Sequence, residues 1–316
     1  MELEPLVRPL FTFVGNNTVR IGSFRCLSVA LQALPADVRE SALSDKALRY
    51  VYRTALERTQ ETWLQCEALT LLEALSPDSL DRALALRIEC AEAGDDLFVR
   101  RHAVRLLGRR LAANPQLHPL LDHAATDPNP AVRQAVADIL HLAPAPRVAA
   151  VLPVLLGADN EAAVRASAVL GIARLCVRTD LLELARSELR RVLEQEPDRF
   201  VLRTALEATV RGHASLQDAP EAADAWLRTL TPALASLHTG ATHLAVRRWA
   251  AQARERLWGQ ADPAARALLA CIGPALRDVQ QGRPRNLRQL RLHEEDPVLL
   301  GRVLALLAQR DFGFDL

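Results

Sequence analysis

The chain has 316 residues; half are hydrophobic, only 4% are aromatic, and the formal net charge is +1. That length is ample for one large or two ordinary domains. The balanced charge excludes an overall field that would attract nucleic acid or an anionic membrane. The hydrophobic residues are mainly Leu, Ala and Val, and because Leu and Ala favour helices, the composition predicts an all-α protein.

The cysteines are odd in number, widely spread and never arranged as a CxxC pair. They are Cys26, Cys66, Cys90, Cys176 and Cys271. Such spacing does not indicate a disulfide framework or a zinc site, and in their apolar segments we expect buried thiols. We expect a cytoplasmic protein, because the N-terminus lacks a signal-peptide pattern and no apolar stretch is long enough to span a membrane.

One phrase recurs along the chain and is clearest over residues 127–140. An acidic turn residue is followed by a hydrophobic marker, then Arg, then a small residue or Val one helical turn later. The marker returns every 32 to 45 residues, as Val19, Leu64, Val99, Val132, Val164, Val201 and Val246. Self-similarity at such a period indicates a stack of structural repeats.

The spacing within the phrase predicts the role of each position. The marker and the residue four positions later share one helical face, and a small residue there lets a neighbouring helix approach closely. The acidic residue, such as Asp127, lies where it would cap the coming helix. A second amphipathic segment lies between markers, so we expect each repeat to be a helix pair that only its neighbours can cover.

The repeats differ in clarity along the chain. Residues 95–211 carry the clearest copies. We expect one domain over residues 1–316, in which residues 1–60 and 262–316 form atypical capping repeats. We expect a longer loop over residues 212–220, which would account for the wide spacing there. An eighth helix pair is expected around residues 297–309.

The Asp-x-x-x-x-Val-Arg-x-x-(Ala/Val) phrase resembles the HEAT-repeat family, most closely over residues 99–173. The resemblance implies an all-α, right-handed α-solenoid of about seven to eight stacked helix-pair repeats. It also implies a structural ladder in which the arginines after the markers pair with turn carboxylates of adjacent repeats. These arginines are Arg100, Arg133, Arg165 and Arg247.

The copies differ chiefly at outward positions of the marker helices, so these are the candidate binding positions. In the family such helices line the concave surface, and the resemblance places five side chains in or near a groove: Arg101, Arg105, Arg203, Arg248 and Trp249. Structural roles in helix ends and ion pairs are the alternative for the arginines. An outward Trp is a suitable contact anchor.

A secondary basic segment contains Arg283, Arg285, Arg288 and Arg291. Arginines three residues apart form a basic helical edge suited to phosphates or to an acidic protein. The segment lacks interleaved aromatic residues for base stacking, and a solvated connector is the alternative interpretation.

Catalytic signatures are absent from the sequence: there is no nucleophile elbow, phosphate-binding loop, dinucleotide turn or zinc-protease motif. We therefore expect no catalytic residue, metal or cofactor. The leading hypothesis is a non-enzymatic scaffold or adaptor that binds another protein or peptide along a concave solenoid surface. The alternatives are a nucleic-acid-binding HEAT-like protein, in the manner of DNA glycosylases with this fold, and a lyase or chaperone for a cofactor-bearing protein.

Overall fold

The computed structural model describes residues 16–35, 38–39, 44–89 and 96–261, and every regular element in these ranges is helical. The prediction of an all-α protein is confirmed. The chain forms two compact units, residues 1–175 and residues 176–316.

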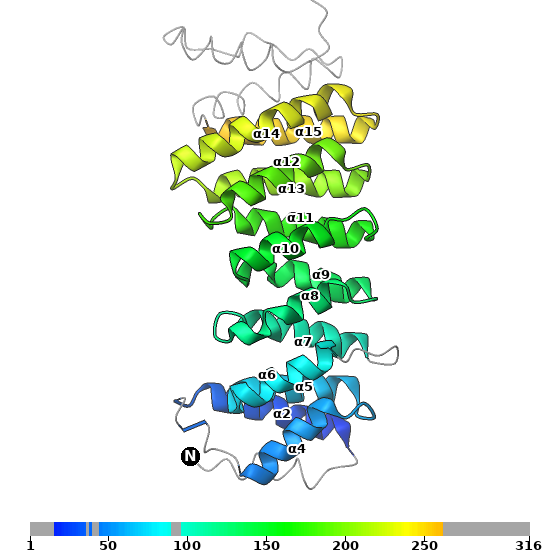
Figure 1. The fold of residues 1–316 in the computed structure, drawn as a ribbon, viewed down its shortest axis with the longest axis vertical. Coiled ribbons are helices and arrows are strands. Elements are labelled where there is room, and N and C mark those ends of the chain that lie inside the picture. The colour runs from blue at the N-terminus through cyan, green and yellow to red at the C-terminus, as the bar shows by residue number, and fades with distance from the viewer. Residues whose placement is uncertain (1–15, 36–37, 40–43, 90–95, 262–316) are drawn as a thin grey trace, which may run out of the picture. The chain divides into compact units, whose positions relative to one another are not determined.

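In the first unit the marker helices form one layer, in which each helix packs against the next (Figure 1). They are α2 (Asn17–Gln32), α5 (Thr62–Leu75), α7 (Leu97–Arg110), α9 (Pro130–Ile139) and α11 (Ala162–Leu175). The intervening helices form the other layer, which consists of α4 (Asp45–Leu56), α6 (Pro77–Glu89), α8 (Pro119–Ala125) and α10 (Ala145–Leu155). Short 3-10 turns, η1 (Pro115–Leu117) and η2 (Leu140–Leu142), precede α8 and α10.

The second unit has the same arrangement. Its marker helices, α13 (Arg199–Ser215) and α15 (Leu244–Ala261), pack against each other, and so do α12 (Leu182–Gln195) and α14 (Pro220–Gly240). All seven markers lie in helices, as the repeat pattern predicts. Helix pairs stacked in two layers are the architecture of an α-solenoid.

Burial follows the predicted period. The six markers from Leu64 to Val246 are at most 1% exposed, and so are the small residues or valines four positions after them. Gly108 of α7 shows how closely neighbouring helices approach, because a Cβ there would lie 2.8 Å from the Ile139 side chain of α9. Small residues therefore set the distance between adjacent repeats.

The loop expected over residues 212–220 is shorter than predicted, because only residues 216–219 lie between the helices. Helix α13 continues to Ser215, and much of the wide repeat spacing comes from α14, which has 21 residues. Gly212 lies within α13, and the absence of a side chain there leaves room for the ring of Trp226, which is fully buried. The indole nitrogen of Trp226 donates to the Thr209 carbonyl at 2.9 Å. This glycine is therefore a packing position and not a turn.

Asp127 does not cap the next helix, which corrects a second prediction. The cap of α9 is Asn129, whose Oδ1 accepts from the Ala131 N–H. The Asp127 carboxylate accepts two hydrogen bonds from Arg100 of α7, at 3.0 and 3.1 Å, and one from the Asn129 N–H at 2.7 Å. Both Arg100 and Asp127 are 6% exposed, so the charge of each compensates the other in the core.

The predicted ladder of carboxylate partners is confirmed at two of the arginines. Arg100 pairs with Asp127, and Arg133 pairs with Glu161 in the turn before the next marker helix. Arg133 also donates from Nη1 to the Asp127 carbonyl at 2.5 Å. These two arginines therefore connect consecutive repeats.

Two further arginines of the row reach back to the turn before their own helix. Arg165 Nη1 donates to the Asn160 carbonyl at 2.5 Å, and Arg247 Nε donates to the Ala241 carbonyl at 2.6 Å. Turn carbonyls have no partner in a helix ladder, so a guanidinium satisfies them. In these two repeats the residue after the marker thus fastens the turn to its helix.

Replacing Asp127 with Ala would leave Arg100 buried without its carboxylate. We expect the free energy of unfolding to fall by about 3–5 kcal/mol, measured by urea unfolding. Asp159 holds the equivalent position in the next copy and is exposed, so Asp159→Ala is the matched control, expected within about 0.5 kcal/mol of the parent protein. Equal decreases in the free energy of unfolding of the two variants would contradict a stabilising role for the buried pair.

Gly212→Ala would place a methyl group against the Trp226 ring. Overpacking of this kind costs about 1–3 kcal/mol, so the melting temperature should fall. Gly240→Ala in α14 is the control, since nothing lies within 4 Å of its Cβ position and Ala favours a helix. An unchanged melting temperature for Gly212→Ala would show that the ring does not pack there.

Candidate functional site

Helices α13 and α15 leave a hollow of about 290 Å³ between them, here named the α13–α15 hollow. Four residues of α13 line it: Arg203, Leu206, Glu207 and Val210. Four residues of α15 line it from the other side: Trp249, Gln252, Ala253 and Arg256. Both helices are marker helices of the second unit.

Local capping fixes where the lining residues fall. Asp198 begins α13, because its Oδ1 accepts from the N–H groups of Phe200 and Val201 at 2.7 and 3.1 Å. The markers Val201 and Val246 are buried, so the residues two and three positions later turn toward the surface. Arg203 and Trp249 thereby reach the rim of the hollow.

The hollow has a cationic group at each end. At one end the Arg203 guanidinium lies over the Trp249 ring, 5.4 Å from its centroid, a cation–π contact. Arg256 follows Trp249 by seven residues, which is about 10 Å along a helix. Leu206 and Ala253 are buried and form the apolar base.

The charge of the hollow is mainly positive. Glu207 is its one lining carboxylate, and it pairs with Arg211 Nη2 at 2.5 Å. Within the part of the chain that the structure describes, Arg203 and Arg256 form no ion pair. Two exposed guanidinium groups are thus left to meet an anionic group.

The structure brings together two of the five predicted groove residues. Arg203 and Trp249 line one hollow, whereas Arg248 is exposed on α15 and does not line it. Arg101 and Arg105 lie on α7 of the first unit. Arg105 is exposed, and Arg101 is half-buried with an Nε that makes no hydrogen bond within the described residues. Binding at any of the five stays a prediction.

The remaining sequence predictions about the C-terminal part fall outside the described residues. They concern the basic segment with Arg283, Arg285, Arg288 and Arg291, the capping repeat over residues 262–316, and the eighth helix pair.

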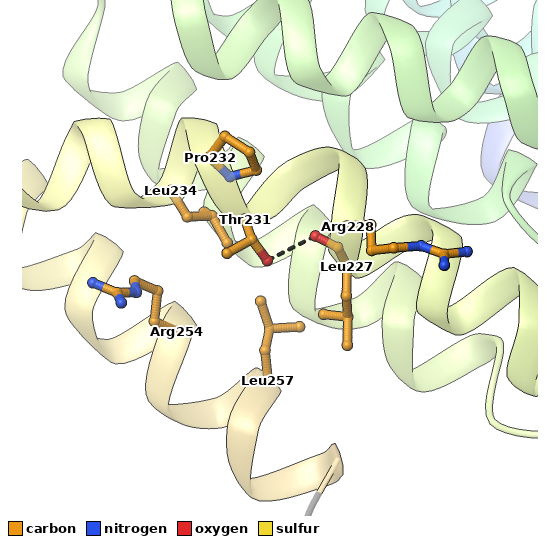
Figure 2. A pocket seen from close by; sticks show the side chains of 7 residues that line it. All are labelled: Leu227, Arg228, Thr231, Pro232, Leu234, Arg254 and Leu257. Carbon is orange, nitrogen blue, oxygen red and sulfur yellow. Dashed lines mark hydrogen bonds between the residues drawn. The ribbon is translucent and has the colours of Figure 1, made fainter. Parts of the chain in front are cut away.

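A second hollow, the α14–α15 hollow, has about 350 Å³ and a largely apolar lining (Figure 2). Leu257 of α15 points toward Leu227 and Thr231 of α14. The Thr231 hydroxyl donates to the Leu227 carbonyl of the same helix at 2.7 Å, so it has no proton left to donate to a ligand. Arg228 of α14 and Arg254 of α15 are the charged residues in its lining. The lining suits an apolar group and holds no nucleophile.

Sequence reasoning missed an exposed aromatic pair in the first unit. Trp63 of α5 and Phe98 of α7 are 58% and 53% exposed, with ring centroids 6.2 Å apart. Both stand one position before a marker, as does Phe200, which is 56% exposed. The signal was available, because comparing that position across the seven copies shows an aromatic residue in three of them.

The cysteines are only partly as predicted. Cys66 and Cys176 are buried free thiols, but Cys26 is exposed on α2, so the expectation of a buried thiol is wrong there. Cys26 lies in an apolar stretch of sequence, yet its side chain is exposed. Cys90 and Cys271 lie outside the described residues.

Among residues 16–35, 38–39, 44–89 and 96–261, no group of three His, Cys, Asp or Glu side chains could hold a metal ion. No helix in these ranges combines the length and the apolar character needed to cross a bilayer.

The fold defines the class of protein, which is an α-solenoid built of helix pairs. Similarity to a known repeat family makes this class more specific. The model for HEAT repeats matches residues 84–173 and, overlapping them, residues 117–211. Residues 84–211 therefore carry HEAT repeats, as the Val-Arg phrase predicts. No curated protein matches it.

The cysteines allow a test of the packing. Burial raises the pKa of the Cys66 thiol to about 12 and that of Cys176 to about 11, so few of these groups are reactive thiolates near neutral pH. We expect a maleimide to modify Cys26 in the native protein long before Cys66 or Cys176, as read by peptide mass spectrometry. All three should react in denaturing urea, and equal native rates would contradict the burial.

Proposed function

We propose that the chain is a non-enzymatic interaction scaffold, and that its α13–α15 hollow holds a protein or peptide partner. HEAT repeats commonly serve as protein-interaction scaffolds, and this chain consists of them over residues 84–211. Stacked repeats offer extended surfaces for contact without a reactive pocket.

The Arg203–Trp249 pair is the observation that carries the proposal. Trp and Arg are the residue types that most often dominate the energy of protein interfaces. Here the half-buried Trp249 ring is held beneath the Arg203 guanidinium, so little side-chain freedom remains to be lost on binding. A partner would meet a preformed aromatic and cationic surface.

The alternative function, nucleic-acid binding, is supported less well than protein binding, because outward arginines of the first unit are paired with carboxylates. Arg109 of α7 pairs with Glu73 of α5 at 2.8 Å, and Arg25 of α2 pairs with Glu67 of α5. Arginines already paired with carboxylates contribute little to counterion release from a phosphate backbone. The described charge pattern of the first unit is mixed, which suits a protein partner better.

The test starts with the chain isolated, after chemical cross-linking, from the cells that produce it. The co-isolated protein is then purified, and its affinity is measured by calorimetry. Trp249→Ala removes an interface anchor, which typically costs about 2 kcal/mol or more, so we expect affinity to fall by at least about 30-fold.

Arg190→Ala is the matched control, because Arg190 is an exposed arginine on α12 that pairs with Glu194 of its own helix. It should bind the partner like the parent protein. A Trp249→Ala variant with unchanged affinity would contradict the proposed site.

A further inference from the structure

The two ends of the α13–α15 hollow set a distance between anionic groups. Arg203 lies over Trp249, and Arg256 follows Trp249 by seven residues on α15, a rise of about 10 Å along the helix axis. Neither arginine has an ion pair within the described residues. A ligand that satisfies both needs two negative groups at about that separation.

An extended peptide in the polyproline II conformation meets this spacing. That conformation has three residues per turn and a rise of about 3.1 Å per residue, so residues i and i+3 point the same way about 9 Å apart. In a β-strand, by contrast, residues i and i+3 point to opposite faces. Aromatic surfaces such as Trp249 are also typical contacts for polyproline II segments.

The middle of the hollow favours a peptide over a nucleic acid. Glu207 and Gln252 both line the hollow, and the Gln252 amide can donate to peptide carbonyl groups. The Glu207 carboxylate disfavours a backbone with one charge per nucleotide more than a peptide that carries two spaced carboxylates. Trp249 is the one aromatic residue in the lining, and Arg203 covers one of its faces. A strand of bases would need further stacking surfaces.

We propose that the hollow recognises an acidic polyproline II segment of the form Glu-x-x-Glu, or its Asp equivalent. One carboxylate meets Arg203 beside Trp249, and the other meets Arg256. This inference rests on the proposed scaffold function and specifies the chemistry of the partner segment.

Three capped peptides and one oligonucleotide test the inference on the full chain. The peptides are Glu-Pro-Pro-Glu, its permutation Glu-Pro-Glu-Pro and the neutral Gln-Pro-Pro-Gln, and an oligothymidylate is the nucleic-acid probe. Binding is followed by the NMR signal of the Trp249 indole N–H, which the Trp249→Phe variant assigns. We expect the affinity for Glu-Pro-Pro-Glu to be at least about fivefold higher than the affinities for the permuted and neutral peptides.

Arg203→Gln and Arg256→Gln should each weaken Glu-Pro-Pro-Glu by a similar factor, and Arg190→Gln should leave its affinity unchanged. Unchanged circular dichroism melting curves confirm that each variant is folded. The permuted peptide binding as tightly as Glu-Pro-Pro-Glu, or oligothymidylate binding that depends on Arg203 and Arg256, would overturn the inference.

The two proposals fail in distinguishable ways. Should the partner depend on Trp249 while no acidic peptide binds or competes with it, the scaffold role stands and the acidic segment is wrong. Should the partner bind normally to Trp249→Ala, the hollow is not the interaction site, whatever the peptides do.

Discussion

The buried pair between Arg100 and Asp127 is the interaction on which the order of the repeats most visibly depends. A helix pair cannot cover its own apolar face, so consecutive pairs must stack in a defined register. The pair joins α7 to the turn before α9, and a buried charge tolerates little displacement from its partner. Arg133 continues the connection to Glu161. Fixed turns leave the outward positions free to vary, and the proposed binding surface lies there.

Much of the fold could be predicted because its determinants are local and repeated. Markers and small residues lie on one helical face, and their period alone places them in the core. The errors arose where a residue acts on a distant one. Gly212 has the sequence features of a turn, but its role depends on the Trp226 ring of the next helix. Asp127 has the sequence position of a helix cap, but its carboxylate forms an ion pair with the buried Arg100.

The candidate site could be predicted only in part, for the same reason. Outward position on one helix suggested Arg203 and Trp249, and the structure places both at one hollow. Glu207, Gln252 and Arg256 join them through the register between α13 and α15, which no single-helix pattern contains. The joining of these side chains at one surface is what gives the hollow its spaced positive charges and its aromatic face.

Site-specific photocross-linking in the producing cells tests the central claim most directly. A photoreactive amino acid at Gln252, an exposed residue that lines the α13–α15 hollow, should yield a cross-link to one defined protein. The same group at Ser187, exposed on α12, is the control and should not capture that protein. A partner captured equally from both positions, or captured only from Ser187, would contradict the account.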